Sequence, residues 1–223
     1  MENITPINGD CLQELPKLDN ESVDLVVTDP PYGMSFQSNR RKVRYSPIEN
    51  DDSLDWLDEL FAQCYRVLRP DTHIYCFCSF HQVDRFKQSM ERQFTVKNIL
   101  IWQKNNVSMG DLEGDYAPQY EMILFGAKGR RLLYGSRDSN ILPCYRTGNK
   151  LHPTQKPLEL MSYFIEKSSD RGQMVLDPFL GSGTTALAAL QMGRKCVGIE
   201  KDTGYYTVAT ERVSGAQLGL FTD

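Results

Sequence analysis

A short motif at positions 28–33, T-D-P-P-Y-G, contains groups that could activate an aromatic amine. The lone pair of such an amine is delocalised into its ring, which makes the nitrogen a poor nucleophile. The Asp29 carboxylate and the Pro30 carbonyl could accept hydrogen bonds from the two N–H groups of the amine, and the rigid Pro30-Pro31 pair would fix that carbonyl. Tyr32 could stack on a planar base. A base within a duplex would first have to flip out. The plainer interpretation is a turn that ends a strand, for which two prolines and a glycine are also suited.

A second segment, 177–185 with the sequence D-P-F-L-G-S-G-T-T, is typical of a ligand-binding turn between a strand and a helix. Its glycines let the backbone approach a ligand closely, and the helix that follows favours electronegative groups at its first residues. No lysine follows Gly183, as a phosphate-binding loop would require, and the third glycine of a dinucleotide fingerprint is missing. A tight turn alone would explain the two glycines. However, Glu200 after the next expected strand suits the hydroxyl groups of a ribose, so the pattern favours a nucleoside-like cofactor.

The elements that must position these residues alternate between strands and helices, as in α/β proteins. The apolar pattern predicts strands at 23–28, 73–79, 96–103, 120–125, 174–176 and 196–199. It predicts helices at 54–68 (after an Asp52-Ser53 cap), 80–92, 158–167, 183–192 and 205–213. The polar, glycine-rich segments 105–118 and 126–151 are expected to be loops.

Length and composition predict a single domain without a membrane span. The chain has 223 residues and no apolar run of the length that a bilayer requires. Its acidic first residues are unlike a secretory signal, so a cytoplasmic protein is expected. The six cysteines are scattered without a C-x-x-C pair, which favours reduced, buried thiols over disulfides and gives no metal site.

The net charge of −4 argues against a nucleic-acid partner, but the basic residues are locally clustered. One cluster consists of Arg40, Arg41, Lys42 and Arg44, and a second cluster occupies 128–131. Either could simply be a solvated surface loop. The first cluster follows the Asp29 motif directly, which makes it the better candidate for contacting the phosphates of a nucleic acid.

Four motifs, in this order, resemble those of the amino-methyltransferase family that modifies bacterial and phage DNA. The loop 8–11 (N-G-D-C) resembles the one beside the cofactor's adenine, and Asp29–Tyr32 resembles the catalytic motif. The segment 152–157 (H-P-T-Q-K-P) resembles the one before the helix that closes over the cofactor's methionine end. The segment 177–185 resembles the cofactor motif. Together they span nearly the whole chain.

The resemblance implies S-adenosylmethionine as the cofactor, no metal, and a site drawn from all four motifs. The catalytic residues implied are Asp29, Pro30, Pro31 and Tyr32. The cofactor-binding residues expected are Asp10, Cys11, His152, Thr154, Lys156, Asp177, Phe179, Gly181, Ser182, Gly183, Thr184, Thr185, Glu200 and Lys201. The DNA-binding residues expected are Arg40, Arg41, Lys42 and Arg44. The partner expected is double-stranded DNA.

The order of the motifs is similar to the circularly permuted beta group of this family, because the Asp29 motif precedes the cofactor motif. The implied fold is a single-domain, Rossmann-like class I methyltransferase over residues 1–223. Its sheet would have seven mostly parallel strands, helices on both faces and an antiparallel hairpin at one edge. A short target-recognition insert is expected around 104–151, which leaves room for help from a second subunit in a homodimer.

The activity implied is methylation of the exocyclic amine of adenine, at N6, after the base has flipped out. Aspartate rather than serine at the first catalytic position favours adenine over N4 of cytosine by the habit of the family. A protein glutamine methyltransferase is a further alternative, but its motif usually begins with asparagine and is not permuted. A catalytically silent DNA-binding remnant is another alternative, against which the intact motifs speak. The expected setting is the cytoplasm of a bacterial or phage-infected cell.

Overall fold

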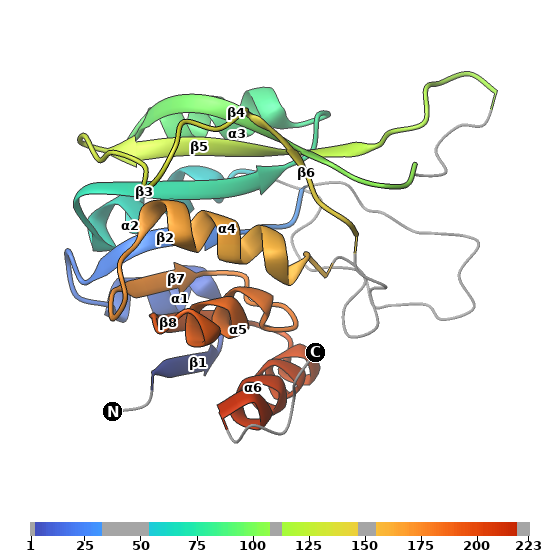
Figure 1. Cartoon of the computed structure of the whole chain (residues 1–223). Helices are drawn as coiled ribbons and strands as arrows, with labels where there is room; N and C mark the ends of the chain where they lie inside the picture. Colours follow the sequence, from blue (N-terminus) through green and yellow to red (C-terminus); the bar gives the residue numbers. More distant parts are fainter. Residues whose placement is uncertain (1–2, 33–53, 108–112, 147–154, 218–223) are drawn as a thin grey trace.

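An eight-stranded sheet forms the centre of the computed structural model, which describes residues 3–32, 54–107, 113–146 and 155–217 (Figure 1). The strands lie in the order β1-β8-β7-β2-β3-β5-β4-β6. Their bounds are β1 Ile4–Asn8, β2 Val23–Thr28, β3 Leu68–Cys78, β4 Thr95–Gln103, β5 Tyr120–Lys128, β6 Ile141–Pro143, β7 Met174–Asp177 and β8 Lys195–Glu200. Within this part of the chain β5 runs antiparallel to both of its neighbours, and all other strand pairs are parallel.

Helices cover both faces of the sheet (Figure 1). One layer contains α1 (Cys11–Glu14), the short 3-10 helix η1 (Leu15–Lys17), α2 (Leu57–Val67) and α3 (Val83–Glu91). The other layer contains α4 (Leu158–Ser168), α5 (Thr184–Gln191) and α6 (Thr203–Gln217). No helix in the described part of the chain is long and apolar enough to cross a membrane. All six cysteines are free and buried.

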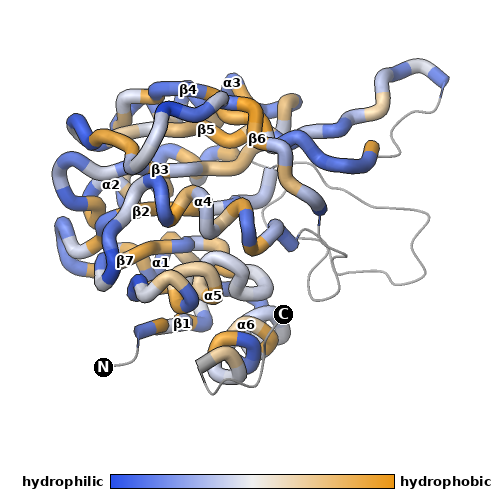
Figure 2. The backbone as a smooth tube through the Cα atoms, in the orientation of Figure 1, coloured by the Kyte–Doolittle hydropathy of each residue, from blue (hydrophilic) through white to orange (hydrophobic). Residues whose placement is uncertain are grey.

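The central strand β2 shows why these residues form a sheet covered on both sides. All six of its residues are buried, and alternate side chains enter different cores. Leu25 and Val27 pack with Phe164 of α4, whereas Val26 packs with Phe61 of α2. A strand buried on both faces has a mostly apolar rather than an alternating sequence, and this one is apolar at 23 and 25–27, with Asp24 as the charged exception (Figure 2 shows the hydropathy along the chain).

The predicted α/β fold is confirmed, and the strand count of seven needs a correction to eight. The extra strand, β6, lies in a segment predicted to be a loop and pairs with β4, so the β4–β5 hairpin is not outermost. Strand β5 also continues to Lys128, three residues beyond the predicted end. Strand β1 was also missed, because the apolar pattern predicted no strand before residue 23.

Helix α2 begins at Leu57, later than predicted, and Asp52 and Ser53 lie outside the described residues. Residues 54–56 form coil and turn. The helix ends at Val67, one residue before the predicted end at 68, and β3 begins at Leu68, five residues before the predicted start of that strand. The register between β2 and β3 shifts just where Pro70 lies, which accommodates a residue that cannot donate to the ladder.

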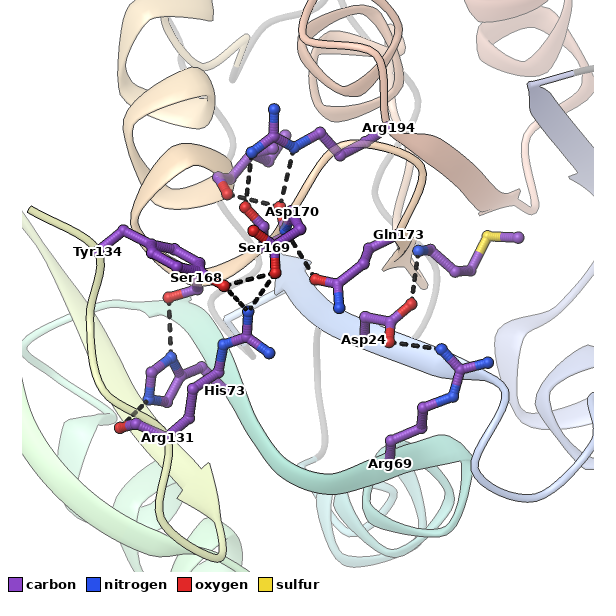
Figure 3. A network of polar contacts seen from close by, with 12 residues as sticks. Asp24, Arg69, His73, Arg131, Tyr134, Ser168, Ser169, Asp170, Gln173 and Arg194 are labelled. Carbon is purple, nitrogen blue, oxygen red and sulfur yellow. Dashed lines mark hydrogen bonds and ion pairs between the residues drawn. The ribbon is translucent and has the colours of Figure 1, made fainter.

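A polar network fixes the amino ends of the parallel strands (Figure 3). Asp24 of β2 is buried, lies 2.5 Å from Arg69 Nη1 and accepts a hydrogen bond from the Met174 backbone N–H at 2.8 Å. Arg194 donates to the Ser169 carbonyl at 2.6 Å, just after α4. These contacts tie β2 to β3 and β7, and the end of α4 to the segment before β8. The opposite edge, where the parallel strands end, carries the sequence-predicted motifs.

Candidate active site and cofactor site

The fold brings the Asp29 motif and the glycine-rich segment 177–185 to the same edge of the sheet. Strands β2 and β7 pair in parallel, with Leu25 opposite Val175 and Val26 opposite Leu176. Asp29 follows the last residue of β2, and Asp177 is the last residue of β7. Open α/β sheets bind ligands at the carboxyl ends of such neighbouring strands. The two motifs therefore lie beside each other at this edge of the sheet.

Both carboxylate oxygens of Asp29 already have partners within the chain. The Tyr32 hydroxyl donates to Oδ1 at 2.6 Å, and Lys156 Nζ lies 2.6 Å from Oδ2. The sequence predicted neither contact. Lys156 was expected at the methionine end of the cofactor, whereas the structure pairs it with the candidate catalytic carboxylate. An incoming amine would therefore have to compete with a phenol and an ammonium for Asp29.

Lys156 also contacts a second carboxylate, which extends the site to the β4–β5 hairpin. Its Nζ lies 3.0 Å from Glu121 Oε2 and 4.9 Å from the centre of the Phe77 ring. The other oxygen of Glu121 accepts from Lys104 Nζ at 2.7 Å. We call Asp29, Lys156, Glu121 and Lys104 the four-charge cluster. Two carboxylates and two ammonium groups balance one another, as groups removed from water must.

The acidities in the four-charge cluster reflect burial opposed by pairing. Burial raises the pKa of Asp29, although the Lys156 ammonium opposes that rise. Burial alone would lower the pKa of Lys156, but the carboxylates of Asp29 and Glu121 raise it above its ordinary value. Burial would raise the pKa of Glu121, but Lys156 and Lys104 bring it below its ordinary range. Lys156 therefore remains an ammonium at neutral pH.

Tyr32 is held beside Asp29 as a neutral phenol. Burial, followed by the nearby Asp29 charge, raises the pKa of its hydroxyl well above the ordinary range. Its half-buried ring meets Phe86 of α3 edge-on, with centroids 6.3 Å apart. Pro30 is buried and Pro31 half-buried. The stacking of Tyr32 on a base remains a prediction.

The glycine-rich segment has the backbone shape that the sequence predicted. Gly181 and Gly183 adopt φ values of 53° and 80°, in the left-handed region that favours glycine. The Leu180 N–H donates to the Ile199 carbonyl at 2.8 Å, and the Gly181 N–H donates to Glu200 Oε2 at 2.7 Å. Glu200, at the end of β8, thus holds the turn between β7 and α5 in place.

Three carboxylates lie at the carboxyl ends of the neighbouring strands β7, β8 and β1. Asp177 is buried, and burial raises its pKa to about 7, while burial also raises the pKa of Glu200. Asp10 caps α1 by accepting from the Leu12 N–H at 3.0 Å, and Lys201 Nζ lies 3.4 Å from its other oxygen. Carboxylates with lone pairs to spare suit hydroxyl and cationic groups and disfavour phosphates. This set of acceptors fits a nucleoside that carries positive charge.

The remaining predicted cofactor residues divide into three groups. Phe179 presents a ring against Trp56, with centroids 5.7 Å apart, and Lys201 is half exposed. Cys11, Ser182, Thr184 and Thr185 are buried as whole residues. Burial raises the pKa of the Cys11 thiol to about 12, so it is not a reactive thiolate. His152, Thr154, Arg40, Arg41, Lys42 and Arg44 lie outside the described residues.

Glu121, Lys104 and Trp56 belong to the site but were not predicted. Glu121 carried a signal, because it is a lone acid in the apolar run 120–125. A charged residue at a buried position needs a partner, and its presence there could have suggested a site. Lys104 and Trp56 gave no comparable signal.

Comparisons with known proteins agree on one family. The model of a DNA methylase family matches residues 23–141 and 138–211. DNA adenine methyltransferase YhdJ of Escherichia coli (strain K12) is 30% identical over 251 residues, which cover 95% of this chain and 83% of that protein. The crystal structure of the M1.HpyAVI–SAM complex superposes with a TM-score of 0.73 at 27% identity, covering 94% of this chain and 99% of that one.

A further solved structure shows how widely the fold is shared. The cytosine-N4-specific PvuII DNA methyltransferase superposes with a TM-score of 0.79 over 95% of this chain and 86% of its own. Its identity is 20%, so the likeness concerns the fold alone.

Proposed function

This chain belongs to the DNA methylase family and is an S-adenosylmethionine-dependent DNA amino-methyltransferase, and we propose that the amine it methylates is N6 of adenine. The observation that carries the proposal is the Asp29 carboxylate, which follows β2 beside the glycine turn after β7. Aspartate at this position and the 30% identity to a DNA adenine methyltransferase support adenine. Methylation of N4 of cytosine is the second candidate, because the PvuII enzyme has the same fold.

The chain's residues would act mainly by orientation. The substrate amine would displace the Tyr32 hydroxyl or the Lys156 ammonium from Asp29. Asp29 and the Pro30 carbonyl would then accept hydrogen bonds from the two N–H groups of the amine. This arrangement favours a pyramidal nitrogen with its lone pair free. Holding the nitrogen in line with the reacting carbon could contribute up to about 7–11 kcal/mol. Because burial raises the pKa of Asp29, this carboxylate is also suited to take the proton that the methylated nitrogen sheds.

The carboxylates around the glycine turn fit S-adenosylmethionine, which supplies a methyl group on a positively charged sulfonium when bound. The cofactor also carries a ribose with two hydroxyls and an ammonium group. We propose that Glu200 and Asp10 accept the hydroxyls and that Phe179 lies against the adenine. The backbone at Gly181 and Gly183 would allow close approach. The acidic set also explains why a triphosphate would be disfavoured here.

Replacing Glu200 by alanine should weaken S-adenosylmethionine binding by about 1.5–3 kcal/mol, the usual contribution of a hydrogen bond to a charged group. The variant loses a hydroxyl acceptor and the bond that holds the Gly181 N–H. Isothermal titration calorimetry measures the change. Glu211→Ala removes an exposed acid of α6 and serves as the control, which should bind normally. An unchanged Kd for Glu200→Ala would mean that Glu200 does not contribute to the cofactor site.

The DNA would approach the edge where the parallel strands end. The chain between β4 and β5 projects from this edge (Figure 1), and its base is closed by the Lys104 N–H, which donates to the Gln119 carbonyl at 2.8 Å. Tyr116 on this projection is 93% exposed, and Tyr145 after β6 is 76% exposed. We propose that this recognition insert, around 104–151, contacts DNA together with the basic residues 40–44.

Alanine at Arg40, Arg41, Lys42 and Arg44 should weaken DNA binding without changing the methylated sequence. These residues follow the Asp29 motif in the sequence, and contacts to phosphates orient a duplex without reading it. The slope of log affinity against log salt should become shallower by about 0.9 for each lost contact. Titrations at several salt concentrations measure it. An unaltered slope would place the cluster away from phosphates, and a changed target sequence would place it on base edges.

Mapping modified bases in DNA from cells that express the protein tests the choice of base. The expected result is N6-methyladenine within a short recurring sequence, absent from cells that express Asp29→Asn. Detection of N4-methylcytosine instead would contradict the choice of adenine and support cytosine as the methylated base.

A further inference from the structure

We infer that Glu121 of β5 is a positioning residue of the active site, which shares the Lys156 ammonium with Asp29 and thereby keeps the Asp29 carboxylate available to the amine. The inference deepens the proposed function and rests on Asp29 being the acceptor for the substrate amine.

The geometry places Lys156 between two competing carboxylates. Lys156 Nζ lies 2.6 Å from Asp29 Oδ2 and 3.0 Å from Glu121 Oε2. The side chain is 6% exposed and lies against the Phe77 ring, so it has little room to turn toward solvent. The ammonium is therefore divided between the two acids.

Glu121 is fixed from two sides. Its backbone pairs with Trp102 in the β4–β5 ladder, and its Oε1 accepts from Lys104 Nζ at 2.7 Å. The Trp102 indole N–H in turn donates to the Cys144 carbonyl at 2.9 Å. Glu121 is therefore a well-anchored partner for Lys156, at the base of the projecting recognition insert.

Competition for Lys156 affects what Asp29 can do. Without Glu121, Asp29 would be the remaining carboxylate of the four-charge cluster, and the ammonium would occupy it more completely. A carboxylate held by one cation in a poorly solvated site is a weaker acceptor for another donor. Sharing leaves Asp29 with a partner that the amine can displace. A purely structural Glu121 would only neutralise the two lysines.

The charges around Asp29 set its acidity, and the kinetics of the double variant described below separate a positioning role of Glu121 from neutralisation alone. The titratable groups that act on Asp29 come from every neighbouring element, namely Lys156, Glu121, Tyr32, Cys76, Cys78 and Asp177. Among them, the Glu121 charge raises the pKa of Asp29 and the Lys156 charge lowers it. Removing Glu121 should lower the pKa of Asp29, and removing Lys156 should raise it.

The experiment measures that acidity directly in the cofactor-free protein. Aspartate labelled with ¹³C at its carboxylate is followed by NMR against pH, and Asp29→Asn identifies the Asp29 resonance. Glu121→Gln should lower the pKa of Asp29 and Lys156→Met should raise it. Glu121→Asp, which keeps the charge, should restore most of the wild-type value. Glu91→Gln removes an exposed acid paired with Lys87 at 2.6 Å and should change nothing.

Kinetics with saturating cofactor and DNA provide the second readout. Glu121→Gln should lower kcat about tenfold, the size of a moderate pairwise interaction, and leave cofactor affinity unchanged. Because Glu121 acts through Lys156, the same substitution in a Lys156→Met background should cause no further loss. If Glu121→Gln does not fold, Lys104→Met is measured instead. This variant should raise the pKa of Asp29, because Glu121 loses its pair with Lys104 and interacts more strongly with Lys156, which weakens the pair between Lys156 and Asp29.

Three results would overturn the inference. They are an unchanged Asp29 pKa in Glu121→Gln (or in Lys104→Met, where that variant replaces it), a change in the opposite direction, and rate losses that multiply in the double variant. The proposed function fails separately, if Asp29→Asn keeps full activity. An inactive Asp29→Asn together with an unaffected Glu121→Gln would remove this inference and leave the proposed function in place.

Discussion

Asp29→Asn should lower the rate of methyl transfer by about 10²–10⁴-fold, the range that a positioned acid–base group contributes, while the Kd for S-adenosylmethionine stays within a few-fold. Asparagine keeps the size of the side chain but presents an amide N–H₂ where the carboxylate accepts bonds from Tyr32 and Lys156. It has one acceptor oxygen instead of two, carries no charge and cannot take up a proton. The rate is measured in single-turnover reactions, and binding by calorimetry.

The control for this variant is Asp19→Asn, an exposed aspartate before β2. It should react and bind as the wild type does. Equal losses of rate and of cofactor affinity in Asp29→Asn would contradict the division of labour between the Asp29 motif and the glycine turn. A thermal unfolding curve distinguishes that outcome from a variant that is simply misfolded.

Gly183→Val should weaken S-adenosylmethionine binding at least about a hundredfold. Gly183 has φ 80°, and a Cβ added there would lie 3.0 Å from Ala209 Cβ and 3.2 Å from its Cα. A left-handed conformation costs an ordinary residue about 1–2 kcal/mol, and the contact with α6 adds to that cost. The turn must therefore change shape, and with it the backbone that the cofactor approaches. Calorimetry gives the affinity.

Gly172→Val is the matched control, because it separates backbone strain from damage to the site. Gly172 also has φ 80°, but nothing lies within 4 Å of an added Cβ, and it lies before the amino end of β7, away from the cofactor turn. It should lose about 1–2 kcal/mol of stability and keep its cofactor affinity. Equal affinity losses in both variants would show that general destabilisation, rather than the shape of the turn, is responsible.

Sequence patterns predicted those parts of the fold that depend on neighbouring residues. The segment 23–28 indicated a buried strand because it is apolar at 23 and 25–27, as a strand covered on both faces requires. The glycines at 181 and 183 indicated left-handed backbone because few other residues tolerate it. The location of both motifs at the carboxyl edge followed from parallel strand pairing.

The parts that could not be predicted depend on contacts between distant segments. Strand β6 has three residues and forms because β4 offers an open edge, which no local pattern reveals. The four-charge cluster joins residues from the Asp29 motif, the β4–β5 hairpin and the segment before α4. A lysine that resembles a cofactor ligand in the sequence can equally pair with a carboxylate, and only the three-dimensional arrangement distinguishes the two.

The most direct test of the account is nucleoside analysis after reaction in vitro. The purified protein is incubated with unmethylated duplex DNA and S-adenosylmethionine labelled on its methyl group, and the DNA is then digested to nucleosides for mass spectrometry. The account predicts labelled N6-methyldeoxyadenosine with the wild type and none with Asp29→Asn. Label on a ring carbon of cytosine, or no labelled nucleoside with a protein that binds both the cofactor and DNA, would contradict it.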